Sequence, residues 1–419
     1  MAETEKKQAS PEAGLHNHST SDTIRTEEHE ETTWDLILLV EHDPELKRLL
    51  EKAILRASQI NPDRSTNPAD ALDSFYRFLD WAVKAAPWEP FPKVEYLAFY
   101  QRMEQGMGMF YFICDQPLEE LADRGYYHNS LLYHEPFRSW VVKYVSACGR
   151  YLNTEASWNE EYYALAKEDK AMRLDEDLYE APSNWHTFNE FFARRLCDPS
   201  CRPIAGANDP SVVVFPADSL PMGVWDIDAD NCVVMPEPDA RRGIAIKTGT
   251  LRNVSALLGN SKYADAFAGG TLTHTFLDAY DYHRYHFPVT GMIKEVQMIP
   301  ADDAPGGIVV WEEENKRYNL LFSDVYGWQS LETRGVVILE TVNGGLAAVI
   351  PVGMCMVSSV NFEEPVTEGT QVRKGDPLGC FMFGGSDIVM LFSKDAGFTM
   401  TAEAMVHGNM GNAYGILQK

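Results

Sequence analysis

The pattern of hydrophobic and polar positions divides the chain into three stretches. Residues 1–32 are rich in Glu, Thr, Ser and Lys with almost no large apolar side chains, which predicts a disordered acidic tail. From Trp34 onward apolar residues recur at helical spacing, and within 72–83 they fall at i, i+3, i+4 and i+7, typical of an amphipathic helix. Similar patterns predict helices at 44–58, 94–103 and 137–151. We therefore expect residues 33–180 to form a helical N-terminal domain.

After residue 180 the pattern changes to short apolar segments separated by Gly and Pro, which is typical of strands. The uncharged stretch 341–362 contains Gly and Pro, so we interpret it as two buried strands joined near Pro351 rather than as a membrane span. The sequence predicts an α+β fold in which residues 181–419 form a mostly β domain with a barrel-like half. The segments involved are a short helix at 188–196 and strands at 212–215, 243–247, 292–298, 307–311, 335–341, 346–352 and 354–360.

The composition is that of a globular protein, with 419 residues, 45% hydrophobic and 11% aromatic. Its formal net charge of −26 opposes binding to nucleic acid or to an anionic membrane surface. We therefore expect neither a nucleic-acid partner nor an integral membrane segment.

Cysteine usage bears on the compartment. Seven cysteines at irregular positions, behind an N-terminus without the features of a signal peptide, indicate a reducing environment and predict a cytoplasmic protein. Cys197 and Cys201 form a close pair. Because no second Cys or His pair follows at ligand spacing, no metal site is expected.

Near the C-terminus, Ser386 follows Gly384 and Gly385 between two apolar stretches. We predict a tight bend between two strands, where the serine hydroxyl can reach the carbonyl of Gly385. Attack there converts the amide into an ester, β-elimination cuts the chain, and hydrolysis leaves a pyruvoyl group on the new N-terminus. That ketone is an electron sink. Taken alone, however, Gly-Gly-Ser more often marks an ordinary hairpin.

Further motifs, in a fixed order, change this interpretation. Over residues 185–395 the chain resembles the phosphatidylserine decarboxylase family. The resemblance implies self-cleavage between Gly385 and Ser386, a pyruvoyl cofactor made from Ser386, and removal of a substrate carboxylate as CO2 through a Schiff base. The motifs that carry it are Phe188-x-x-Phe191-Phe192-x-Arg194-x-Leu196, Arg202-Pro203-Ile204, Phe215-Pro216-Ala217-Asp218 and Asp281-Tyr282-His283-Arg284-Tyr285-His286.

The resemblance also implies roles for individual side chains. Self-cleavage needs a base and a carboxylate that orients it, and the family positions match His286 and Asp218. His283 is implied as the proton donor in decarboxylation. Arg284 either holds a substrate carboxylate or forms an orienting salt bridge. We interpret His128, His134 and His274 as structural and assign no role to His407.

Two features bear on the substrate. The family usually has Thr or Ser after the cleavage serine, whereas Asp387 follows here, and its carboxylate either helps to deprotonate Ser386 or opposes the developing oxyanion. The segment 275–278, Gly353-Met354 and the Phe-Gly-Gly-Ser form of the cleavage site are similar to those of soluble fungal L-tryptophan decarboxylases. We therefore favour a free aromatic L-amino acid as the small-molecule substrate, with phosphatidylserine as the alternative. Family members commonly pair, which implies a homodimer.

Three interpretations from other classes remain. An uncleaved silent homologue acting as a binding protein is supported by Asp387. A serine hydrolase using Ser386, His286 and Asp218 lacks the Gly-x-Ser-x-Gly elbow. The segment 366–379 resembles the turn of lipoyl and biotinyl carrier domains, but Lys394 lies beyond the next strand instead of at a hairpin tip.

Overall fold

The structure is a computed structural model that describes residues 29–87, 98–122, 124, 128–234, 253–300, 307–322, 328–354, 359–383 and 385–418. The strand expected at 243–247, Gly384, most of the predicted tail and parts of the segments 94–103 and 354–360 lie outside the described residues.

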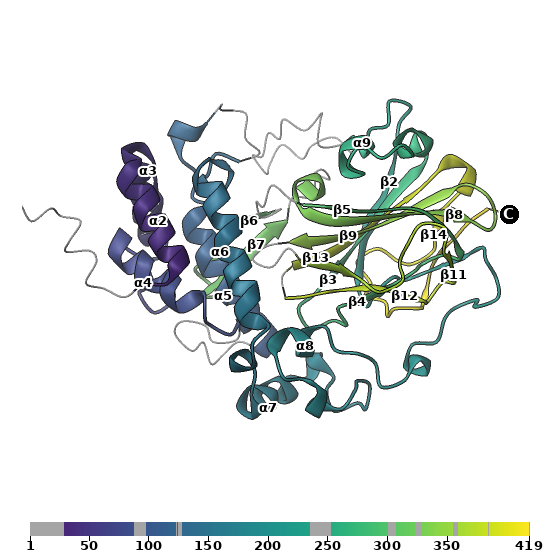
Figure 1. The fold of residues 1–419 in the computed structure, drawn as a ribbon, viewed down its shortest axis with the longest axis horizontal. Helices are drawn as coiled ribbons and strands as arrows, with labels where there is room; N and C mark the ends of the chain where they lie inside the picture. The colour runs from purple at the N-terminus through teal and green to yellow at the C-terminus, as the bar shows by residue number, and fades with distance from the viewer. Residues whose placement is uncertain are drawn as a thin grey trace, which may run out of the picture.

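The N-terminal half is helical and lies at one end of the molecule (Figure 1). Asp43 caps one of these helices by accepting a hydrogen bond from the amide of Leu46, and Pro44 occupies its first turn, where its missing N–H costs nothing. The predicted helices at 44–58, 72–83 and 137–151 are confirmed. In the described part of the chain the earliest helix begins at Glu31, so it includes the last two residues of the predicted tail. The helices are α2 (Glu31–His42), α3 (Pro44–Ile60), α4 (Leu72–Ala82), α5 (Phe99–Cys114), α6 (Phe137–Leu152), α7 (Glu160–Glu168), α8 (Phe188–Phe192) and α9 (Val254–Leu257).

The C-terminal half is built on a seven-stranded antiparallel sheet in the order β11-β5-β8-β9-β13-β3-β2. Two three-stranded sheets, β10-β12-β4 and β1-β15-β14, and the hairpin β6-β7 complete it. The strands are β1 (Val212–Val214), β2 (Leu220–Asp226), β3 (Thr271–Leu277), β4 (Arg284–His286), β5 (Gly291–Ile299), β6 (Gly307–Glu312), β7 (Arg317–Phe322), β8 (Thr333–Thr341), β9 (Leu346–Met354), β10 (Val360–Phe362), β11 (Gln371–Val372), β12 (Pro377–Phe381), β13 (Gly385–Phe392), β14 (Thr399–Met400) and β15 (Ala413–Ile416).

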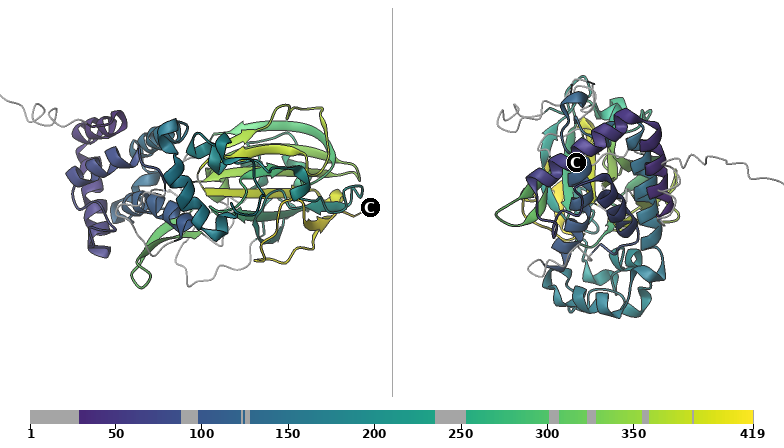
Figure 2. Two further views of the ribbon diagram at one scale, coloured as in Figure 1. Left: turned by 90° about the horizontal axis from the view of Figure 1, so that it is seen from below. Right: turned by 90° about the vertical axis from the view of Figure 1, so that its left-hand side faces the viewer.

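The large sheet separates two hydrophobic cores because successive side chains of a strand point to opposite faces. Val389 and Leu391 of β13 pack in the core that the helices share with the sheet. Ile388 and Met390 of the same strand pack in the core beneath the small sheets. Figure 2 shows the N-terminal helices, drawn in purple to blue, gathered at one end of this sheet.

The α+β class is confirmed, and the large sheet is open, with β11 and β2 at its edges. Two local predictions are wrong. β9 runs through Pro351, which pairs with Ile388, so the expected junction of two strands is one continuous strand. Two strands flank the Gly-Gly pair as expected, but Ser386 lies within β13 and not at the bend, and the alternative of an ordinary hairpin is excluded because β12 and β13 belong to different sheets.

The division into a helical and a β domain at residue 181 stays a prediction, since the two halves share a core. None of the helices in the described part of the chain is long and apolar enough to cross a membrane.

Candidate active site

Ser386 lies near the start of a central strand. It pairs with Leu277 of β3 on one side and with Gly353 of β9 on the other. Its side chain is 0% exposed, and its Oγ has no hydrogen-bond partner among the described residues. Thr275 Oγ1, on the same face of the sheet, is buried in the same way. A buried hydroxyl without a hydrogen-bond partner lowers the stability of the fold by about 1–3 kcal/mol, so Ser386 and Thr275 are destabilising in this arrangement.

The family motifs converge on the face of the sheet to which Ser386 points. The backbone amide of His286 donates to the carbonyl of Pro216 at 2.7 Å, which joins the Pro-Ala-Asp segment to β4. Phe215, Ala217 and Phe287 lie in the same core as Ile388, two residues after Ser386. The structure therefore brings the segments that carry Asp218 and His286 beneath the start of β13.

The side chains of Asp218 and His286 have other partners within this arrangement. His286 Nδ1 donates to the carbonyl of Gly375 at 2.9 Å, and its Nε2 lies 3.2 Å from the hydroxyl of Tyr282. Asp218 forms a buried, bidentate ion pair with Arg202 and accepts from the amide of Met410 at 2.8 Å. Within the described residues, no hydrogen bond joins Asp218 to His286 or His286 to Ser386. The relay expected from the family stays a prediction.

The electrostatics of His286 favour the neutral ring. Burial lowers its pKa, while the carbonyl of Gly375 and the carboxylate of Asp218 act in the opposite direction. Asp218 is thus close enough to act on His286 through space. With Nδ1 donating to the carbonyl, Nε2 carries the lone pair of a base.

His283 is held in a defined tautomer. Its Nδ1 donates to the carbonyl of Asp281 at 2.9 Å, and its buried Nε2 has no hydrogen-bond partner among the described residues. Burial, assisted by the charge of Arg194, lowers the pKa of His283 well below its usual value. The ring of His283 stacks on the ring of Phe192 with centroids 3.8 Å apart. Phe192 in turn contacts the ring of Phe383, three residues before Ser386.

Sequence reasoning did not assign the groups that position this histidine. The fully buried Arg194 donates to the carbonyls of Tyr280 and Asp281 at 2.9 and 3.1 Å. The carboxylate of Asp281 lies 2.8 Å from His407 Nε2. A buried arginine in the Phe-Phe-x-Arg motif was the available signal, whereas nothing in the spacing of Asp281 and His407 indicates their pairing.

Arg284 forms the orienting salt bridge that was one of its two expected roles. It pairs with Glu363, and its Nε donates to the carbonyl of Ala193 at 2.8 Å.

Asp387 lies on the opposite face of the sheet from Ser386. Its Oδ2 is 2.7 Å from His274 Nε2, and its Oδ1 has no hydrogen-bond partner among the described residues. The ring of His274 stacks on Trp225 with centroids 6.2 Å apart. The carboxylate is therefore directed into the helix-side core, away from the serine hydroxyl. Strand alternation would have predicted this, had the bend not been placed at Ser386 itself.

A model of the phosphatidylserine decarboxylase family matches residues 188–415, more than half of the chain. The chain belongs to the phosphatidylserine decarboxylase family. The match begins at α8, includes every motif named above, and ends within β15.

Curated members of the family show the same relationship. Phosphatidylserine decarboxylase proenzyme 2 of Oryza sativa is 33% identical over 226 residues, 54% of this chain and 32% of that protein. Proenzyme 3 of Schizosaccharomyces pombe is 34% identical over 206 residues, 49% of this chain and 19% of that protein. The chain thus spans less than a third of the length of these two relatives.

A fungal relative matches over a longer stretch. Decarboxylase iboD of Amanita muscaria is 27% identical over 305 residues, 66% of this chain and 82% of that protein. This share of the chain exceeds the 188–415 match, so the likeness continues into the helical half.

Proposed function

We propose that this chain is a pyruvoyl-dependent decarboxylase that cuts itself between Gly385 and Ser386. The observation that carries the proposal is the buried Ser386 hydroxyl without a partner, placed directly after two glycines in a member of this family. The residues present fit a self-derived cofactor, because Gly385 adds no side chain beside the carbonyl that the hydroxyl must reach.

In the proposed maturation, Ser386 Oγ attacks the carbonyl carbon of Gly385, and the peptide nitrogen leaves as a free amine, which turns the amide into an ester. Removal of the Ser386 Cα proton then expels the carboxylate of Gly385 and leaves dehydroalanine. Water hydrolyses this residue to a pyruvoyl group with release of ammonia. His286 Nε2 is the base that we assign to the hydroxyl proton, after the Tyr282 hydroxyl moves away from it.

The pyruvoyl ketone supplies an electron sink for the bond that breaks when CO2 leaves. We assign to His283 the transfer of the proton that replaces the carboxylate. Because Nδ1–H is held by the carbonyl of Asp281, the unpaired Nε2 first takes up a proton released by the substrate ammonium group and then passes it to the carbon that has lost CO2. The rings of Phe192 and Phe383 beside it exclude water from this proton.

We propose a free aromatic L-amino acid as the substrate. An L-tryptophan decarboxylase of Psilocybe cubensis is 28% identical over 221 residues, half of this chain. The long match to the Amanita decarboxylase includes residues of the helical half. A small apolar cavity is lined by residues of α4, α5 and α6 and by Phe383, so these helices lie next to the cleavage segment. The net charge of −26 also disfavours an anionic lipid surface.

The alternative substrate is phosphatidylserine. It is supported by the identities of 33% and 34% to two phosphatidylserine decarboxylase proenzymes, which exceed the 27% and 28% to the Amanita and Psilocybe decarboxylases. The proposal also includes a cytoplasmic location, because the six cysteines of the described residues are free thiols, as is usual in a reducing compartment.

The test begins with intact-mass measurement of the denatured protein and of Ser386→Ala, before and after borohydride treatment. We expect two chains split at residue 386, a reducible carbonyl on the smaller chain, and a single chain in the variant. The processed protein is then given L-tryptophan, other L-amino acids and phosphatidylserine vesicles while CO2 is measured. An intact wild-type chain contradicts the proposal, and release of CO2 from the vesicles alone selects the alternative substrate.

A further inference from the structure

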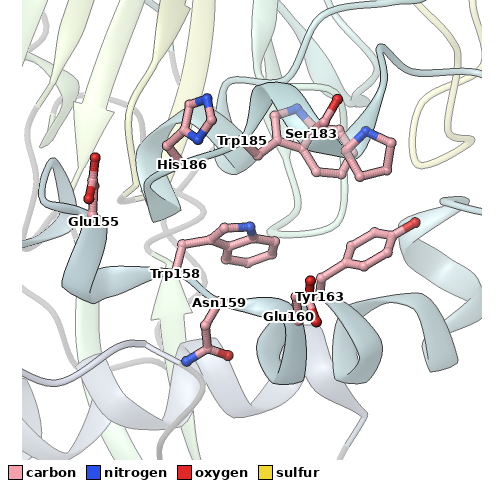
Figure 3. Close-up of a pocket in the computed structure, with 9 residues that line it drawn as sticks. Glu155, Trp158, Asn159, Glu160, Tyr163, Ser183, Trp185 and His186 are labelled. Carbon is pink, nitrogen blue, oxygen red and sulfur yellow. The ribbon is translucent and has the colours of Figure 1, made fainter.

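A second candidate binding site lies on the outer side of α8. An open pocket of about 860 Å³ is bordered by the start of α7 and by the segment around residues 182–186 (Figure 3). Its aromatic lining residues are Trp158, Tyr163 and Trp185, and its polar ones include Glu155, Glu160 and His186. We call it the α7 pocket.

The aromatic walls of the α7 pocket are fixed by the fold. Trp158 stacks on Phe191 with centroids 4.3 Å apart and an interplanar angle of 18°. Trp185 Nε1 donates to Glu180 at 3.3 Å, and its ring lies 6.1 Å from that of Tyr163 at 59°. Trp158 and Trp185 are held by partners outside the pocket and are only 9% and 5% exposed, so they form a preformed floor, whereas Tyr163 is partly exposed and offers the accessible ring.

The polar lining has one sign of charge. Glu155 and Glu160 contribute two carboxylates, and neither Lys nor Arg is among the lining residues, all of which the structure describes. Asn159 uses its side-chain oxygen to cap α7 by accepting from the amide of Tyr162. Aromatic faces beside carboxylates attract cations, and more strongly than either group alone.

The α7 pocket is separate from the candidate active site. α8 lies between them, with Phe191 packed against Trp158 of the pocket and Phe192 stacked on His283. A ligand in the α7 pocket therefore has no path to Ser386 through the rings of this helix.

We propose that the α7 pocket binds an organic ammonium ion that carries an aromatic or other apolar body. The body packs on Tyr163 and on the floor formed by Trp158 and Trp185, and the positive charge faces Glu160, which lies beside Tyr163 (Figure 3). This assignment does not depend on cleavage at Ser386 or on the substrate of the reaction.

The test uses benzyltrimethylammonium, a quaternary cation without N–H that cannot condense with a ketone. Its affinity for the full-length protein is measured by calorimetry, beside phenylacetate and benzyl alcohol as anionic and neutral probes of similar size. We expect saturable binding of the cation that weakens with ionic strength, and no saturable binding of the other two.

Variants locate the site. Tyr163→Ala and Glu160→Gln are each expected to weaken binding of the cation about three- to tenfold, while Tyr163→Phe retains it, since the ring face is kept. Glu168→Gln, at the far end of the same helix, is the matched control for charge and should leave the affinity unchanged. Ser386→Ala should bind as the wild type does, which separates this result from the outcome for the proposed function.

Three results overturn the proposal. They are the absence of saturable cation binding, equal affinity in wild type, Tyr163→Ala and Glu160→Gln, and binding of phenylacetate as tight as that of the cation. A thermal unfolding curve for each variant that matches the wild type ensures that lost binding reports on the pocket.

Discussion

Ser386 and Asp387 are neighbours in β13, yet they lie in different surroundings. Ser386 points toward the segments that carry His286 and Asp218, with its hydroxyl unpaired. Asp387 points into the core shared with the helices and pairs with His274. Each face thus holds a histidine and a carboxylate, but only one of them also presents a nucleophile. Proximity along a strand therefore says little about shared chemistry, because the sheet itself lies between adjacent side chains.

The largest effect should come from removing the histidine on the Ser386 face. His286→Ala is expected to slow cleavage at Ser386 by about 100- to 10,000-fold, the contribution of a well-placed general base. Time-resolved gel analysis of freshly synthesised protein measures this rate. His274→Ala is the matched control on the other face and should leave cleavage within a few-fold of the wild type. Equal loss of cleavage in both variants would contradict the division of roles.

The second effect concerns stability on the Asp387 face. Asp387→Ala leaves His274 buried without its carboxylate partner, and we expect unfolding in urea to require about 3 kcal/mol less free energy. Asp395→Ala, which removes an exposed acid later in the same segment, should change it by no more than about 0.5 kcal/mol. Both are measured in the Ser386→Ala background, so that all proteins unfold as single chains.

A pH-dependent effect should mark the acids near His283. Burial, followed by the charge of Asp281, raises the pKa of Asp278 from 3.8 to about 6. A raised folded-state pKa means that the folded protein binds the proton more tightly, so this group's contribution to stability falls as pH rises from about 4 to 6. Asp278→Asn removes that dependence. As pH rises through this range, we expect the free energy of unfolding of the variant to increase by roughly 1–3 kcal/mol relative to that of the parent. Urea titrations of the two proteins in the Ser386→Ala background at pH 4 and pH 7 would show a constant difference if this assignment were wrong.

The smallest effect should come from the hydroxyl that occupies His286 Nε2. Tyr282→Phe removes the group that competes with Ser386 for this nitrogen, and we expect cleavage to become about two- to fivefold faster with a loss of about 1 kcal/mol in stability. A slower rate would instead show that Tyr282 orients His286 for the reaction.

The sequence predicted the elements whose signal is local. The apolar stripe of α4 and the Asp-Pro start of α3 specify helices on their own, and the short apolar run at 336–339 in β8 specifies a buried strand. Partnership between strands was not readable in this way. The Gly-Gly pair before Ser386 fits a hairpin locally, but β13 pairs with β9 and β3, more than 30 and 100 residues away in sequence.

The candidate site was predicted in the same uneven manner. Motif order indicated Ser386, His286, Asp218 and His283, and the structure brings their segments together. The ion pair of Asp218 with Arg202 and the contact of His407 with Asp281 are long-range, so no spacing rule could indicate them. Their geometry depends on how the small sheets fold over β13.

The position of β13 has a consequence for the life of the protein. The segment after the proposed cut provides the strand between β9 and β3, and its end, β15, pairs with β1. A cut protein would therefore keep its smaller chain, since release would require opening the large sheet on both sides. Once denatured, however, the two pieces would have to find each other in solution, so refolding would depend on protein concentration and compete with aggregation. The chain would then fold only once, before it is cut, and the cut protein would remain native because it unfolds slowly.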